Sequence, residues 1–125
     1  MMHVFPDDLV VEPEVGSRQW IFDRVVRHHR RQQARCPPEG RCFYRFAGAM
    51  CFAGALIDEE SYRPEMEGHY VRDLVKLFRL PAWFLDNIEL IADLQRLHDT
   101  ASSWTVGMDT ALEIFAAERG LAMPD

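Results

Sequence analysis

The sequence predicts a mainly α fold: a single domain of about four principal helices, with a short strand or β-hairpin near residues 41–53. Three observations predict it. The chain has 125 residues, of which 48% are hydrophobic and 27% charged. That composition is typical of globular proteins, and the length allows a core that needs neither disulfides nor metal. Apolar residues recur at helical spacing in four segments, and one aromatic-rich segment has the composition of a strand.

The N-terminal residues 1–16 are expected to form an extended arm ahead of a helical domain that spans residues 17–125. Pro6 and Pro13 interrupt the arm, and Gly16 ends it.

Ser17 is a suitable N-cap for the first helix, which is expected to run from about Arg18 to Gln33. Asp23 and Arg27 are spaced for an i,i+4 ion pair on its surface. Its apolar positions are Trp20, Ile21, Val25 and one of His28 or His29.

The middle of the chain is less regular. Two prolines and a glycine in Cys36–Gly40 end the first helix, and Arg41–Phe46 is expected to be a strand that turns at Ala47-Gly48. Residues 49–57 favour a short strand followed by a short helix, with a two-stranded hairpin as the alternative. Residues 58–62 could form one helical turn, and residues 63–68 a loop.

The C-terminal half predicts three further helices. The first spans about Tyr70–Arg79, and the second begins near Pro81 and carries an apolar stripe so wide that Leu94 should be a central core position. Ser103 could cap the last helix, which Gly120 followed by Leu121 should end as a Schellman motif.

The net charge of −6 is unevenly distributed, since residues 17–45 hold eight Arg against only Asp23 and Glu39. Such a block either contacts a partner or pairs internally with the acidic remainder of the chain. A protein partner with an acidic surface suits an acidic chain better than nucleic acid does. The candidate partner-binding residues are Arg27, Arg30, Arg31, Arg35, Tyr44 and Arg45.

Three cysteines fall close together, and Cys36, Cys42 and Cys51 could bind zinc with His69 as a fourth ligand. However, the chain lacks the C-x2-C knuckle typical of zinc sites, so structural thiols are the preferred interpretation. No metal and no cofactor are expected.

Nucleophilic catalysis would require a thiolate beside a positioned base, and Cys51, His98 and Asp99 could supply that set. A core thiol and a helix-end histidine explain the same residues more simply, so no catalytic residue is expected. No apolar run is long enough to span a membrane, and the N-terminus lacks the pattern of a signal peptide. The expected location is the cytoplasm.

The middle of the chain carries three short motifs: Cys42-x-Tyr44-Arg45, Cys51-x-x-Gly54-x-Leu56-Ile57 with Asp58-Glu59 after it, and Pro64-x-Met66-Glu67-Gly68. In these motifs the chain resembles a group of small bacterial and phage-encoded proteins. The resemblance implies a small cytosolic accessory protein of phage or prophage type and carries no assigned activity. The expected function is therefore that of a protein-interaction module, such as an inhibitor, immunity or regulatory protein. The alternative is a nucleic-acid- or metal-binding regulator that uses the basic helix 24–35 or the cysteines.

Overall fold

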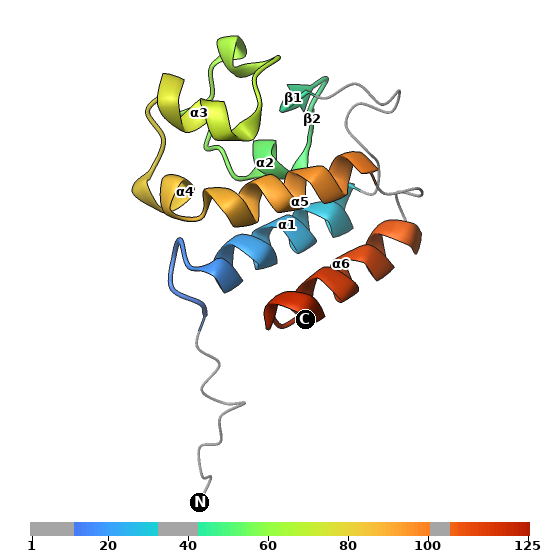
Figure 1. The fold of residues 1–125 in the computed structure, drawn as a ribbon. Coiled ribbons are helices and arrows are strands. Elements are labelled where there is room, and N and C mark those ends of the chain that lie inside the picture. The colour runs from blue at the N-terminus through green and yellow to red at the C-terminus, as the bar shows by residue number, and fades with distance from the viewer. Residues whose placement is uncertain (1–11, 33–42, 101–105) are drawn as a thin grey trace, which may run out of the picture.

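In the view of Figure 1, helix α1 (Arg18–Gln32) lies between α5 (Ile88–Thr100) and α6 (Val106–Arg119), and a small hairpin lies above α5. The short helix that follows the hairpin packs on both α1 and α5. The structure is a computed structural model that describes residues 12–32, 43–100 and 106–125. Within these ranges the chain is mainly helical, and its β-structure is a two-stranded antiparallel hairpin. The mainly α prediction is thus confirmed.

The start of α1 matches the sequence. Ser17 Oγ accepts a hydrogen bond from Trp20 N at 3.2 Å, as an N-cap does. The predicted pair of Asp23 with Arg27 is wrong: Asp23 is buried and accepts a 2.7 Å hydrogen bond from Gln19 Nε2, while Arg27 is exposed. Gln19 and Arg27 are both four residues from Asp23, and the structure pairs Asp23 with Gln19.

Gln19 also joins the two ends of the described chain. Its Nε2 donates to the main-chain oxygen of Ala122 at 2.7 Å, and its Oε1 accepts from Ala122 N at 2.9 Å. One amide side chain therefore satisfies both main-chain groups of a residue 103 positions away.

The last residues of the predicted arm form a turn that packs on α4 (Ala82–Asp86). Ser17 N donates to Glu14 O at 2.9 Å, and Gly16 has φ +85°. A Cβ on Gly16 would lie 2.6 Å from the Cβ of Trp83, so only glycine fits this approach. The rest of the arm, residues 1–11, lies outside the described residues.

The hairpin pairs β1 (Arg45–Phe46) with β2 (Ala49–Met50). Ala47 and Gly48 both have positive φ, 52° and 85°, which is the signature of a tight type I′ turn. Directly after β2 comes the short helix α2 (Phe52–Ala55), capped by Cys51. The favoured strand-then-helix prediction for residues 49–57 is therefore confirmed, and its strand pairs with β1, the described end of the strand predicted for Arg41–Phe46.

Residues 63–68 are more ordered than the predicted loop, because Pro64–Met66 form a turn of 3₁₀-helix. Proline at the first helical position favours this turn. Next, α3 (Val71–Leu77) ends two residues before the predicted limit, where Phe78 takes extended backbone angles.

The predicted central helix is two helices, α4 and α5 (Ile88–Thr100), that meet at Asn87. Asn87 Nδ2 donates to Trp83 O at 2.9 Å and to Gly16 O at 3.1 Å. Asn87 N keeps the helical hydrogen bond to Trp83 O, at 3.1 Å, so the side chain shares that carbonyl and in addition anchors the N-terminal turn.

The last helix, α6 (Val106–Arg119), ends as predicted: Gly120 has φ +68°, and Leu121 N donates to Ala116 O at 2.9 Å. Its predicted cap, Ser103, lies outside the described residues. The ring of Phe115 stacks on Phe22 of α1, with centroids 6.0 Å apart. The core runs through all the main helices, and its fully buried side chains include Phe22, Phe52, Phe84, Ile91, Leu94, Met108 and Leu112.

Candidate functional site

The exposed side of α1 is cationic. The apolar residues Ile21, Phe22, Val25 and Val26 face the core, and the histidines at the end of the helix are buried as well. Solvent therefore reaches only a narrow strip of positions three or four residues apart. The side chains of this arginine strip are Arg24, Arg27 and Arg31, with Arg30 beside them.

The members of the strip differ in how they are held. Arg24 is held by three contacts: its Nη2 lies 3.2 Å from Ala55 O and 4.0 Å from Asp58, and its guanidinium lies 4.8 Å from the ring centroid of Trp20. Arg30 donates to the main-chain oxygen of Asp125 at 3.1 Å. Arg27 and Arg31 are exposed, and the described residues give them neither a hydrogen bond nor an ion pair.

Elsewhere in the described chain, cations pair with nearby carboxylates. Arg72 contacts Glu89, and this hydrogen bond raises the pKa of Arg72 and lowers that of Glu89. Arg119 lies 3.4 Å from Asp93. The acidic half of the molecule is thus partly neutralised by its own bases, and Arg27 and Arg31 have no part in that pairing.

The other two described candidates lie at the hairpin, where both are engaged internally. Tyr44 is 6% exposed and donates its hydroxyl to His69 O. Arg45 Nη2 donates to Ile57 O at 2.6 Å, with the guanidinium over the ring of Tyr62. The buried ring of Tyr44 cannot stack on a large partner, and Arg35 lies outside the described residues.

The cysteines do not form a metal site in the described part of the chain. Cys51 is buried, and its thiol accepts a 3.3 Å hydrogen bond from Gly54 N. His69 packs its ring against Phe78. Across residues 12–32, 43–100 and 106–125, no group of three or more His, Cys, Asp or Glu is placed to hold a metal ion. Cys36 and Cys42 lie outside these ranges.

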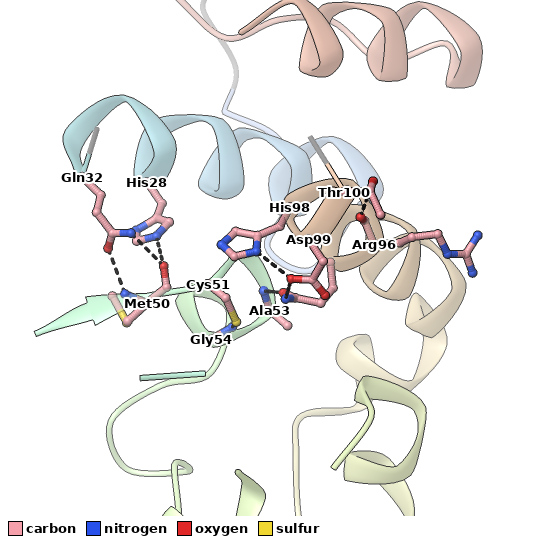
Figure 2. A network of polar contacts seen from close by, with 11 residues as sticks. His28, Gln32, Met50, Cys51, Ala53, Gly54, Arg96, His98, Asp99 and Thr100 are labelled. Atoms are coloured by element: carbon pink, nitrogen blue, oxygen red, sulfur yellow. Dashed lines mark hydrogen bonds and ion pairs between the residues drawn. The ribbon is translucent and has the colours of Figure 1, made fainter. Parts of the chain in front are cut away.

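A polar network joins the start of α2 to α5 (Figure 2). His98 Nδ1 lies 2.9 Å from Asp99 Oδ1, which also accepts from Gln95 Nε2 at 3.0 Å. The Oε1 of Gln95 accepts from Ala53 N at 2.9 Å. Two of the three residues considered for nucleophilic catalysis are thus hydrogen-bonded to each other. Their network satisfies a main-chain amide at the start of α2, which is a structural role.

Three histidines are buried in this region: His98, which belongs to the network, and His28 and His29 of α1. His98 and His29 both present their rings edge-on to Phe52, with centroids 5.0 and 6.4 Å away. His29 Nε2 lies 2.7 Å from Asp109 Oδ1, and His28 Nε2 lies 2.8 Å from Met50 O. Burial is the main cause that lowers the pKa of His28, and the charges of Arg31 and the other two histidines add to it.

Sequence reasoning placed only one of His28 and His29 on the apolar face. The missed signal was that α1 contacts neighbours on several sides, so that adjacent residues are both buried.

A pocket of about 680 Å³ opens between the hairpin, α3 and α5. Sequence analysis did not anticipate it, because its walls come from three separate segments. The lining includes Phe43, Tyr44 and Cys51 from the hairpin region, Gly68 to Asp73 and Lys76 from α3 and the segment before it, and Ala92, Gln95, Arg96, Asp99 and Thr100 from α5.

The chain was compared with known protein families, curated proteins and solved structures. No protein-family model, curated protein or solved structure matches the chain. Among the described helices, none combines the length and the apolar character needed to cross a bilayer.

Proposed function

We propose that this protein is a non-enzymatic interaction module of the cytoplasm that binds an acidic surface on another protein through the arginine strip of α1. The accessory roles of phage-associated proteins, as inhibitor, immunity protein or regulator, fit such a module. The observation that carries the proposal is that Arg27 and Arg31 are exposed and unpaired among the described residues. Internal pairing, the simplest alternative, would have placed carboxylates against them.

The helix itself supports the choice of a protein partner. Most of α1 is packed into the core, so the strip is held on a rigid support. Guanidinium groups make bidentate contacts with carboxylates, and a fixed row of them is complementary to an acidic helix or loop. The chain as a whole has a net charge of −6. This charge disfavours the binding of a long polyanion such as nucleic acid more than the binding of a local acidic patch on a protein.

The test is a paired charge reversal. R27E/R31E should leave the thermal melting temperature nearly unchanged, because exposed charges contribute about 0–1 kcal/mol each. It should weaken binding of the partner, captured by crosslinking and then purified, by about tenfold or more, with slower association at low salt. The matched control is R18E/R79E, which changes the charge equally at two exposed arginines outside the strip.

Three outcomes contradict the proposal. The first is that R27E/R31E unfolds, since the arginines would then serve internal pairing. The second is that the strip and control variants weaken the partner equally. The third is that wild-type protein retards duplex DNA or RNA with a steep salt dependence while R27E/R31E does not, since nucleic acid would then be the partner.

A further inference from the structure

We propose that the pocket between the hairpin, α3 and α5 binds a small aromatic anion, a flat ring that carries a carboxylate or phosphate group. This site is separate from the arginine strip and does not depend on the function proposed for it. Its volume of about 680 Å³ is typical of sites that take metabolite-sized ligands.

The ring is accommodated by the hairpin side of the pocket. Tyr44 and Cys51 form a buried wall there, and Phe43 lies beside them. At the mouth, Tyr70 is 83% exposed, more than any other large apolar or aromatic side chain in the described chain. An exposed ring next to a pocket lined by aromatic residues is suited to stack on a flat ligand.

The anionic group is accommodated by the helical rim. Lys76 from α3 and Arg96 from α5 both line the pocket, and both side chains are more than two-thirds exposed. Their ion pairs, with Asp73 at 3.8 Å and Asp93 at 3.9 Å, are long. Exposed ion pairs of this kind contribute little to the stability of the fold. A ligand anion can therefore replace the two aspartates as the partner of Lys76 and Arg96 at a small cost in free energy.

The remaining charges fix the orientation. Arg72 is held by Glu89 and is less available to a ligand. Asp99, hydrogen-bonded to Gln95 and His98, places a carboxylate on the α5 wall, where it disfavours an anionic group. The ring therefore enters first, and the anion remains at the rim between Lys76 and Arg96.

The experiment is an NMR titration of the full chain with three aromatic anions: adenosine monophosphate, uridine monophosphate and 4-hydroxybenzoate. Adenosine and inorganic phosphate are the reference probes, because each carries one half of the recognised chemistry. We expect at least one aromatic anion to shift the amides of residues 68–76 and 92–100 and to bind more tightly than either reference probe.

Two variants localise the binding. K76Q/R96Q should weaken the aromatic anion about tenfold, whereas R18Q/R79Q, with the same loss of charge elsewhere on the surface, should not. Tyr70→Ala, at an exposed position, should weaken the aromatic anion without affecting phosphate. Any of three results overturns the proposal: no aromatic anion shifts these amides at millimolar concentration, phosphate alone binds as tightly as the aromatic anions, or the control variant weakens binding as much as K76Q/R96Q.

Discussion

The carbonyl oxygen of Tyr44 lies 2.0 Å from the point where a Cβ on Gly54 would stand. Helix α2 is thereby pressed against the residue that precedes strand β1, and a hydrogen bond from Cys51 N to Tyr44 O holds the same contact. Because the oxygen of Tyr44 and the Cα of Gly54 both belong to the main chain, neither can move away by a change of side-chain rotamer.

Gly54→Ala should therefore destabilise the fold by about 3 kcal/mol or more, at the upper end of overpacking effects. Urea unfolding followed by circular dichroism measures the loss. Gly48→Ala is the matched control, since Gly48 has positive φ but open space around it, and it should cost about 1–2 kcal/mol, from backbone strain alone. Equal costs at the two positions would refute the steric explanation.

Leu94→Ala should lower the free energy of unfolding by about 2–5 kcal/mol, because the side chain is fully buried at the centre of α5. Leu85→Ala is the comparison, since Leu85 is 55% exposed and its truncation leaves no cavity. A denaturant melt distinguishes them, and a loss below about 0.5 kcal/mol for Leu94→Ala would contradict its place in the core.

The stability of the protein should fall as the pH drops below 6.5. The folded pKa of His28 lies below its ordinary value of 6.5, mainly because the ring is buried. Below pH 6.5 the unfolded chain takes up a proton that the folded chain resists, so stability present above that pH is lost as the pH falls through the folded pKa.

A substitution isolates the contribution of His28. His28→Gln keeps a donor for Met50 O, and its free energy of unfolding should depend less on pH between 7 and 5 than that of wild type. If His28→Gln and wild type have the same slope, His28 is not the group that titrates.

Glu67 connects the 3₁₀ turn to the hairpin, since its carboxylate accepts from Tyr44 N at 2.8 Å, Arg45 N at 3.1 Å and the hydroxyl of Tyr62. Glu67→Gln should cost about 1.5–3 kcal/mol, because an amide places its own N–H groups against these donors. Burial and this carboxylate raise the pKa of Tyr62 to about 12. The variant should move that pKa back toward 10, and ultraviolet titration of the tyrosines reports it; an unchanged titration would count against the contact.

The sequence predicted elements whose cause is local. The cap at Ser17, the Ala47-Gly48 turn and the Schellman end at Gly120 each depend on a few neighbouring residues, and all three are confirmed. The break at Asn87 was missed, and the side chain of Asn87 is held by Gly16 O, which is 71 residues away. No local pattern carries that information.

The residues of the candidate site likewise depend on contacts that no local sequence pattern predicts. The i,i+4 spacing predicted that Asp23 pairs with Arg27, whereas in the folded protein it pairs with Gln19. That outcome leaves Arg27 available on the surface. Likewise, Glu67 was visible only as part of a Pro-x-Met-Glu-Gly string, and its role became clear once the hairpin was placed beside it.

The amide clamp between Gln19 and Ala122 affects how the chain acquires its structure during synthesis. Near the ribosome α1 emerges early, but the residue that completes its first turn is translated more than a hundred positions later. Until then the first turn of α1 lacks these two hydrogen bonds, and until Phe115 is made the apolar side of α1 lacks the Phe22–Phe115 stack. Nascent chains that end before Phe115 should therefore expose that side to chaperones and proteases, whereas chains that include Ala122 should protect it and also close the first turn.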